Sequence, residues 1–434
     1  MKLQDVDLHV HLLQSLVVED LFELAKDHYQ EINWNRFGFL DRYEKIFGKR
    51  LDPVRMMERA IETGSLDELK EVMVYEYEQD GNFDEFDIKS FFPMCVTGFY
   101  YDNYDYYKVL QKIVDRHKKE GIKYIEYRNG FMFSYKEEWI EWHTNFARFF
   151  KEVSDDTFQA KYIIRIQDPE LYPIVKEMLE LNEDLQGTIV GIDFTEIAPE
   201  QVETLMEQVK HDQLTDPAHT VDVITHVGEN YFDKSIESTI RWCHRWAELG
   251  AKRLAHCIVL GMDPEIQVSR QEHAHESETV EERMNQIYYD LTYKNELESY
   301  GISVDAAALS KELEALKGKE LTEKIRQSYN QERLDVCRKR QDFVIDQLTK
   351  LGTIIETCPT SNLCIGGVPS IETHPFSRLY KSNVNLAICT DDPGIFDQSI
   401  KDEVEFVMNA FNLSEEELTT RLGDPYMFGL KRYK

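Results

Sequence analysis

The stretch Val6–Ser15, with the sequence VDLHVHLLQS, lies almost at the start of the 434-residue chain and holds two histidines one residue apart. Apolar residues at positions 6, 8, 10 and 12 alternate with Asp7, His9 and His11. This period of two predicts a β-strand over residues 5–11 with the three polar side chains on one face. Two histidines at this spacing can reach one metal ion from a strand end, but they can equally be ordinary strand residues.

The composition excludes several classes of protein. The chain has 81 acidic and 50 basic residues, a net charge of -31, which disfavours binding to nucleic acids and to anionic membranes. No apolar run approaches the roughly 20 residues that span a bilayer, and the N-terminus does not resemble a secretion signal. Seven scattered cysteines without a CxxC pair indicate reduced thiols and no thiolate zinc site. We therefore expect a cytoplasmic protein.

The first strand is followed by seven further β-branched runs, with longer helical stretches such as Tyr106–Glu120 between most of them. This alternation is typical of parallel βαβ units, and eight such strands predict an α/β fold of the (β/α)₈ TIM barrel type, a single domain over residues 1–434. The seven runs cover residues 122–128, 162–167, 188–194, 222–227, 253–257, 353–357 and 386–390.

Two connections are too long for a minimal barrel. Residues 14–121 are expected to form a helical segment over the rim at the C-terminal ends of the strands. Residues 262–351, after the sixth strand, form a polar insertion with amphipathic helical patterns. A solvated helical excursion is the favoured interpretation of this insertion, and contact between copies in a homo-oligomer is an alternative. Near the end of the chain, Ser414 and Glu417 form a capping-box pattern that predicts a final helix.

Polar residues also mark the ends of three later strands. His226 ends the fifth strand and Glu229 follows in the next loop, His256 ends the sixth strand, and Asp391 and Asp392 end the eighth. Each has a plain structural alternative, such as a core histidine or a turn. Because active sites of barrel enzymes lie at the C-terminal strand ends, these residues should converge with the first histidine pair.

Three histidines and one aspartate suit a divalent ion of zinc type with a water in the remaining position. Such an ion lowers the pKa of the water toward neutrality and makes hydroxide available as a nucleophile. Glu229 is then left for proton transfer, and His256 for holding or deprotonating the water.

Six motifs, in order along residues 9–393, together resemble the adenosine/AMP deaminase family: HVHL, THVGE, RLAH, ETCPTSN, THP and TDDP. The resemblance implies one zinc ion per chain, bound by His9, His11, His226 and Asp391. It also implies catalytic roles for Glu229, His256 and Asp392. Glu229 matches the proton donor to purine N1, His256 the histidine that orients and deprotonates the water, and Asp392 the aspartate that activates the water and contacts purine N7.

Two departures from the family pattern concern substrate binding. The family usually continues HVHL with Asp-Gly, whereas this chain has Leu13 and Gln14. After the fourth strand the family places a glycine near purine N3, whereas this chain has Glu196. We therefore expect Leu13 and Glu196 to contact the substrate together with Glu229 and Asp392, and the departures leave the identity of the substrate open.

The leading hypothesis is a zinc-dependent aminohydrolase that converts a 6-aminopurine, first of all adenosine or 2′-deoxyadenosine, to the 6-oxopurine and ammonia through attack of metal-bound hydroxide at C6. An alternative keeps this chemistry and changes the substrate to adenine, AMP or a purine modified at N6 or elsewhere. A third hypothesis, ranked lower because no ligand is missing, is a catalytically silent barrel that acts as a binding or scaffold protein.

Overall fold

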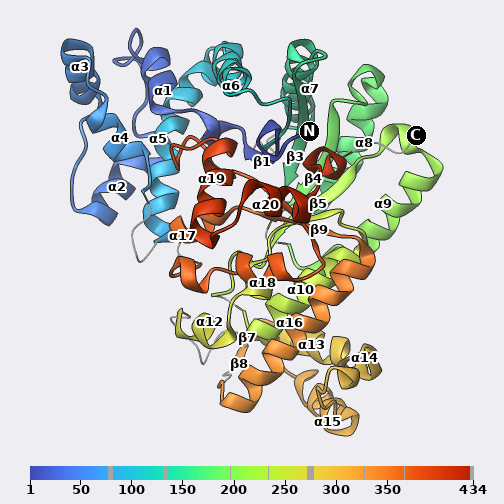
Figure 1. Cartoon of the computed structure of the whole chain (residues 1–434). Coiled ribbons are helices and arrows are strands. Elements are labelled where there is room, and N and C mark those ends of the chain that lie inside the picture. The colour runs from blue at the N-terminus through green and yellow to red at the C-terminus, as the bar shows by residue number, and fades with distance from the viewer. Residues whose placement is uncertain are drawn as a thin grey trace.

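A computed structural model describes residues 1–76, 82–130, 135–195, 197–232, 234–270, 278–325, 328–365 and 367–430 (Figure 1). All eight predicted strands are present, and they form one parallel sheet in the order of the chain. A bridge between Val10 and Asp391 joins the first strand to the end of the last. The (β/α)₈ barrel is thus confirmed. Its strands are β1 Val6–His11, β2 Tyr124–Asn129, β3 Gln159–Ile166, β4 Ile189–Phe194, β5 Asp222–Val227, β6 Arg253–His256, β9 Ile354–Thr357 and β10 Asn385–Ile388.

Between β1 and β2, the described residues of the region predicted to be helical form six α-helices. They are α1 Val18–Ala25, α2 Phe39–Phe47, α3 Pro53–Thr63, α4 Asp67–Met73, α5 Phe83–Asp102 and α6 Tyr107–Glu120. The last of these ends at Gly121, whose φ of 91° is in the left-handed region where glycine carries no steric cost. Helix α5 contributes several side chains to the cavity described below.

The remaining helices cover the barrel and form the insertion. Those that follow β2 to β6 are α7 Lys136–Val153, α8 Tyr172–Leu181, α9 Glu203–Thr215, α10 Ile236–Leu249, α11 Ile258–Gly261 and α12 Pro264–Arg270. The insertion begins with α12 and also contains α13 Val280–Thr292, α14 Lys294–Ser299, α15 Ala306–Leu316 and α16 Gln331–Leu351, with a short antiparallel pair, β7 Glu278–Thr279 and β8 Lys324–Ile325. The last four are α17 Pro359–Cys364, α18 Phe376–Lys381, α19 Ile400–Phe411 and α20 Glu415–Leu422.

Helix α16 differs from the expected solvated excursion. It lies along α10 (Figure 1), and Phe343, Val344 and Leu348 are buried. Apolar side chains at these positions are removed from water against the barrel helices, which is why this part of the insertion packs onto the body of the protein. The interpretation of the insertion as a solvated excursion is wrong for α16.

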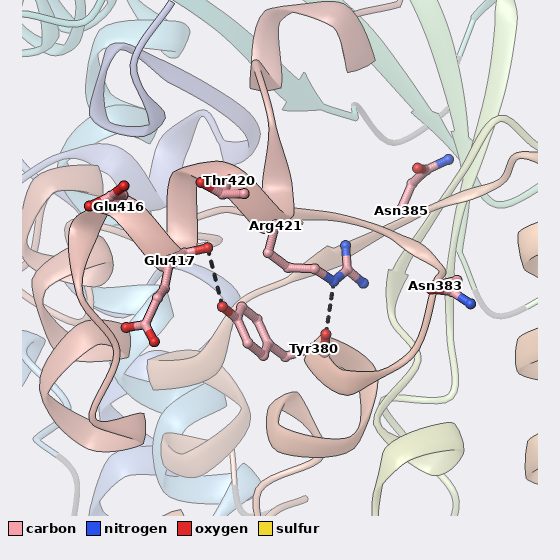
Figure 2. Close-up of a pocket in the computed structure, with 7 residues that line it drawn as sticks. All are labelled: Tyr380, Asn383, Asn385, Glu416, Glu417, Thr420 and Arg421. Atoms are coloured by element: carbon pink, nitrogen blue, oxygen red, sulfur yellow. Dashed lines mark hydrogen bonds between the residues drawn. The ribbon is translucent and has the colours of Figure 1, made fainter.

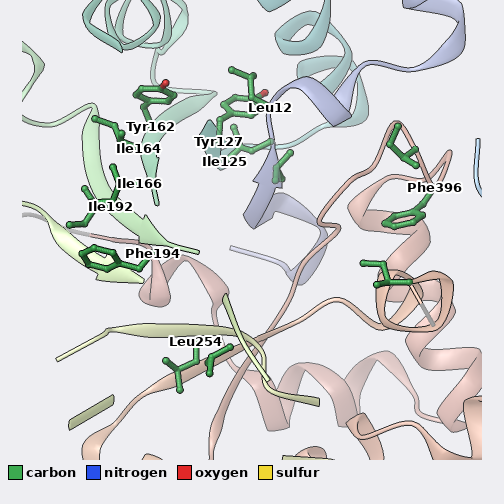
Figure 3. Packing of buried hydrophobic residues seen from close by; sticks show 14 of the residues in the cluster. Leu12, Ile125, Tyr127, Tyr162, Ile164, Ile166, Ile192, Phe194, Leu254 and Phe396 are labelled. Carbon is green, nitrogen blue, oxygen red and sulfur yellow. The ribbon is translucent and has the colours of Figure 1, made fainter. Parts of the chain in front are cut away.

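Apolar side chains from alternate strand positions form the core between the barrel and its surrounding helices. Figure 3 shows Ile125 and Tyr127 of β2 and Ile192 and Phe194 of β4 in this layer, and all four are fully buried. The intervening positions on the same strands are the charged residues Glu126, Arg128 and Asp193. The period of two therefore separates an apolar outer face from a polar inner face.

Charged side chains from four strands, most of which are not neighbours in the sheet, meet inside the barrel. Arg253 of β6 donates from Nη2 to Glu126 Oε2 of β2 and from Nε to Glu356 Oε1 of β9, each at 2.5 Å. Arg128 of β2 forms ion pairs with Glu356 and with Asp193 of β4. All five side chains are completely buried. Because β2 is not a neighbour of β4, β6 or β9 in the sheet, the contacts of Arg128 and the pair of Arg253 with Glu126 can form only across the interior of the ring.

The first strand is less regular than its sequence predicts. Strict alternation places Asp7 on the same face as His9 and His11. The register between β1 and β2 instead shifts between Asp7 and Val10, and the Asp7 carboxylate accepts a hydrogen bond from Thr390 Oγ1 at 2.6 Å. The irregularity also separates Val6 and Leu8, which pack in one apolar cluster, from Val10 and Leu12, which pack in another. The prediction that strict alternation places Asp7 on one face with His9 and His11 is therefore wrong, since the irregularity interrupts the alternation.

Two further expectations concern the whole chain. All seven cysteines are free and buried, in agreement with the prediction of reduced thiols. Among the described residues, none of the helices combines the length and the apolar character that a membrane span requires.

Replacing Arg253 with Met should destabilise the fold, because Glu126 and Glu356 would lose a buried counter-charge. Breaking a buried ion pair on one side costs about 3–5 kcal/mol of unfolding free energy. Urea denaturation followed by circular dichroism measures the effect. The control is Arg50→Met, which removes the surface pair with Glu44 and should cost no more than about 1 kcal/mol. Equal losses in the two variants would contradict the interior network.

Candidate active site

The four predicted metal ligands come together at the C-terminal end of the barrel. Nε2 of His9 and Nε2 of His11 lie 3.3 Å apart, and Nε2 of His11 and Nε2 of His226 are also 3.3 Å apart. Oδ1 of Asp391 lies 3.2 Å from Nε2 of both His9 and His11. One donor atom of each residue is within 4.8 Å of the others.

This donor set fits a zinc ion. Four ligands bound at 2.0–2.1 Å with tetrahedral geometry have donor atoms about 3.3 Å apart. The short distances between three imidazole nitrogens and a carboxylate oxygen agree with that spacing. Nitrogen and oxygen donors of this kind suit zinc-type divalent ions better than magnesium or calcium, which prefer oxygen ligands.

Two buried carboxylates orient two of the histidines from below. Oε2 of Glu356 lies 3.0 Å from Nδ1 of His9, and Oδ2 of Asp193 lies 3.0 Å from Nδ1 of His226. An acceptor on Nδ1 favours the tautomer that carries its proton there and leaves Nε2 available as a ligand. Arg128 pairs with both carboxylates. Despite burial, which alone would raise it, the pKa of Glu356 is held well below its usual range by the Arg128 and Arg253 guanidinium groups.

The other two residues of the cluster, Asp391 and His11, have different partners. Ser361, in the first turn of α17, donates from Oγ to Asp391 Oδ2 at 2.6 Å. Nη1 of Arg165, at the end of β3, lies 3.2 Å from Nδ1 of His11. The Asp391 backbone has a φ of 69°, in the left-handed region. Backbone strain of this kind costs about 1–3 kcal/mol and is typical of functional sites.

His256 and Glu229 lie beside the cluster. Nε2 of His256 is 3.4 Å from Oε1 of Glu229 and 3.9 Å from Oδ2 of Asp391. On its other side, Nδ1 of His256 lies 3.0 Å from Oδ1 of Asn362. An amide oxygen can only accept, so this contact places the proton on Nδ1 and leaves a lone pair on Nε2. Burial raises the pKa of Glu229.

Asp392 has an unusual environment for a carboxyl group. Its side chain is buried, and Oδ1 has no hydrogen-bond partner among the described residues. Burial, together with the neighbouring Asp391 and Glu229, raises the pKa of Asp392 well above its usual range. A buried polar atom without a partner is costly in a folded protein, and at the wall of a cavity it is a natural contact for a ligand.

A cavity of ≈ 830 Å³ opens over the cluster. His11, His226, Glu229, His256 and Asp392 line it. Further lining residues come from the rim helix α5 and from α10 with the loop that precedes it, among them Phe83, Phe86, Phe91, Met94, Lys234, Thr239 and Trp242. Its volume falls in the range of about 300–1,000 Å³ that is typical of small-molecule sites.

Leu13 and Glu196 are the two residues that depart from the family pattern and are expected from the sequence to contact the substrate. Leu13 is partly buried and packs against the hydrophobic core, while the next residue, Gln14, lines the cavity. The Gln14 carbonyl accepts a hydrogen bond from the amide of Gly394 at 2.8 Å, and a Cβ on Gly394 would lie 2.6 Å from that oxygen. Glu196 lies outside the described residues, although its neighbour Thr195 lines the cavity.

A second hollow of ≈ 710 Å³ lies between α18 and α20 (Figure 2). Its wall includes Asn385, at the start of β10 and thus at the opposite end of that strand from Asp391. Arg421 uses its guanidinium on backbone carbonyls, including that of Tyr380 at 2.8 Å. These contacts join α20 to the backbone before β10. Active sites of barrel enzymes lie at the other end of the strands, so we do not assign a catalytic site to this hollow.

Several site residues escaped the sequence analysis. Asp193, Glu356 and Arg128 orient the ligands from within strands, Asn362 orients His256, and Trp242 lines the cavity from α10. A signal did exist for the carboxylates, because a charged residue in an otherwise apolar strand must find a buried partner. Nothing in the sequence identified that partner.

Comparison of the sequence with known proteins gives a partial match. The adenosine deaminase family model matches residues 323–422. An adenine deaminase from Rhizobium leguminosarum bv. trifolii is 37% identical over 75 residues, which is 17% of this chain and 23% of that protein. The match thus spans about a quarter of the length of the curated relative.

Solved structures resemble the fold over nearly the whole chain. Three similar structures are the N6-methyl-AMP deaminase of Arabidopsis thaliana (TM-score 0.54, 14% identity, covering 99% of this chain and 93% of that chain), an Arabidopsis adenosine deaminase-like protein in complex with GMP (0.53, 16%, 99% and 93%) and an amidohydrolase from Burkholderia ambifaria with bound zinc (0.51, 11%, 99% and 86%). Over residues 323–422 the chain is therefore similar to the adenosine deaminase family, and over nearly its whole length it shares the barrel fold of these solved structures.

Proposed function

We propose that the protein is a zinc-dependent aminohydrolase that converts a 6-aminopurine and water to the 6-oxopurine and ammonia. The observation that carries this proposal is the cluster of His9, His11, His226 and Asp391 at the base of a cavity, with four of its donor–donor distances at 3.2–3.3 Å and all donor atoms within 4.8 Å of one another. A bound zinc ion would act as a Lewis acid that lowers the pKa of water.

Glu229 is suited to donate a proton to the ring nitrogen next to the reacting carbon. It lines the cavity, and its carboxyl group is raised in pKa by burial, so the protonated form persists to higher pH than for an exposed glutamate. Protonation of that nitrogen withdraws electrons from the neighbouring carbon and makes it easier for water oxygen to attack.

His256 is suited to accept a proton from the attacking water. Its contact with Asn362 leaves the lone pair on Nε2, which lies between Glu229 and Asp391. The proton can then pass to the amino group, which leaves as ammonia. Asp392, with an unpartnered Oδ1 and a raised pKa, can donate a hydrogen bond to an acceptor nitrogen of the purine and hold the ring in place.

A nucleotide is a second candidate substrate, supported by one observation. The cavity wall includes two cations, Arg165 and Lys234, which can pair with a phosphate. One similar structure contains GMP and another is an N6-methyl-AMP deaminase. Adenosine and 2′-deoxyadenosine remain the first candidates, and AMP, N6-methyl-AMP and free adenine are the alternatives.

A substrate panel tests the reaction itself. Zinc-loaded protein should convert at least one of five purines. Adenosine, 2′-deoxyadenosine, adenine and AMP would release ammonia, and N6-methyl-AMP would release methylamine. A coupled assay for the released amine and chromatography of the purine product measure the reaction. If none of the five is converted, the proposed function is wrong, and a silent binding protein becomes the better description.

Replacing Glu229 with Gln should remove the proton donor while preserving the shape of the side chain. Since proton transfer contributes about 10²–10⁴-fold to a rate, kcat should fall by that factor. Zinc content should be unchanged, because Glu229 is not among the four clustered residues. Unchanged kcat in this variant would exclude Glu229 from the mechanism.

Replacing Arg128 with Met should weaken zinc binding, because Glu356 and Asp193 would lose the cation that fixes them under His9 and His226. Changes to residues that support metal ligands typically reduce affinity about 10–100-fold. Competition with a chromogenic chelator measures the dissociation constant.

The matched control is Arg340→Met, which removes another buried arginine, paired with Asp290 at 2.7 Å in the insertion. This change should reduce stability without altering zinc affinity. If both variants lose affinity equally, the effect reflects general destabilisation, and Arg128 has no particular role at the metal site.

A further inference from the structure

Residues of the insertion make hydrogen bonds to the beginning of α10, the helix that follows the loop with Glu229. Ser235 and Ser238 each donate a hydroxyl hydrogen bond to Oε1 of Glu278, at 2.5 and 2.9 Å. The amide of Ile236 donates to the hydroxyl of Tyr329 at 3.0 Å. Glu278 and Tyr329 both belong to the insertion. The start of α10 is therefore fixed by residues that a minimal barrel lacks.

Charged contacts extend this attachment along α10. Arg333 of α16 donates to both carboxylate oxygens of Glu237, at 2.6 and 3.0 Å. Arg241 is almost completely buried and pairs with Glu200, after β4, and with Glu282, in the first turn of α13. A carboxylate from the insertion thus compensates a buried charge of the barrel helix.

Glu282 also fixes an aromatic side chain of the cavity. Its Oε2 accepts a hydrogen bond from the indole Nε1 of Trp242 at 3.2 Å. Trp242 is 9% exposed and lines the cavity. Nζ of Lys234, another lining residue, lies 4.7 Å from the centre of the Trp242 ring, within the range of a cation–π contact. One insertion residue therefore defines where an indole and an ammonium group stand in the wall.

We propose that Trp242 is a specificity-determining residue and that Glu282, from the insertion, is its positioning residue. The indole packs against the part of the purine substrate that extends beyond the reacting carbon. Aromatic side chains bind bases and sugars through large, rigid surfaces, and a hydrogen-bonded indole has only one ring orientation available. This inference rests on the proposed function for the identity of the ligand.

Within the described part of the chain, Trp242 makes no hydrogen bond with the residues proposed to carry out the reaction. It is not among the four clustered residues, and its described hydrogen bond is to Glu282 rather than to Glu229, His256 or Asp392. Removing the indole should therefore weaken substrate binding without slowing the chemical step. In kinetic terms, KM rises while kcat is preserved, because the contact is equally strong in the ground state and the transition state.

The experiment compares four variants on the preferred substrate of the wild type. Trp242→Ala should raise KM about tenfold or more with kcat within about threefold of the wild type. Trp242→Phe keeps an aromatic ring but loses the N–H group. Glu282→Gln removes the negative charge from the side chain that accepts the Trp242 hydrogen bond. Both changes should raise KM by a smaller factor than Trp242→Ala. The control Glu312→Gln breaks an ion pair with Arg283 inside the insertion and should leave KM unchanged.

Two further measurements separate this inference from the proposed function. Tryptophan fluorescence of the substrate-free protein should change on Glu282→Gln but not on Glu312→Gln. Calorimetry with the 6-oxopurines inosine and IMP first identifies which of these products the wild type binds. The Trp242→Ala variant should bind that product about tenfold more weakly. These readouts do not require turnover, so they hold even if the wild type releases no ammonia.

Three results would overturn the inference. A loss of kcat without a change in KM in Trp242→Ala would make the indole part of the chemistry. An equal effect of Glu282→Gln and Glu312→Gln would mean that the insertion acts only through overall stability. Unchanged KM and product affinity in all Trp242 variants, or a wild type that binds neither substrate nor product, would remove Trp242 from recognition. If Trp242→Ala does not fold, Trp242→Phe and Glu282→Gln decide by the same criteria.

Discussion

The candidate metal site rests on two buried ion pairs, which the Arg128 guanidinium forms with Glu356 and with Asp193. Two carboxylates could not remain ionised inside the barrel without a buried cation, because the loss of hydration would favour their neutral forms. Once ionised, each accepts from Nδ1 of a histidine, and each histidine then presents Nε2 to the same point. A single guanidinium thus links the interior of the fold to the geometry of the proposed metal ligands.

The same constraint explains the inverted polarity of the strands. Barrel interiors are usually filled by layers of branched apolar side chains. In this barrel, Glu126, Arg128, Asp193, Arg253 and Glu356 occupy part of that space, and the apolar residues of the same strands face the helices. Burying five charges offers little net stability compared with an apolar core. What it provides is a rigid polar floor that fixes ligand orientation, while the rim helix α5 and the insertion-supported helix α10 shape the cavity above it.

The barrel and the convergence of His9, His11, His226 and Asp391 at its rim could be predicted from the sequence, because both depend on local periodicity. Alternating residues identified the strands, and a polar residue at a strand end could be assigned to the C-terminal rim without knowledge of any contact. Arg128, Asp193 and Glu356 could not be paired in this way, because their contacts join β2, β4 and β9, which only the closed ring brings together. The shift in β1 that separates Asp7 from His9 is likewise a property of strand pairing. The contact of Trp242 with Glu282 depends on how an insertion folds back onto α10, and no periodicity encodes that.

The most direct test of this account is a crystal structure of the zinc-loaded protein with anomalous diffraction recorded on both sides of the zinc absorption edge. We expect one anomalous peak per chain, about 2.0–2.2 Å from Nε2 of His9, His11 and His226 and from Oδ1 of Asp391. We also expect Glu356 and Asp193 to remain hydrogen-bonded to Nδ1 of His9 and His226. A peak at any other group of residues, or zinc-loaded crystals without a peak at this cluster, would contradict the central claim.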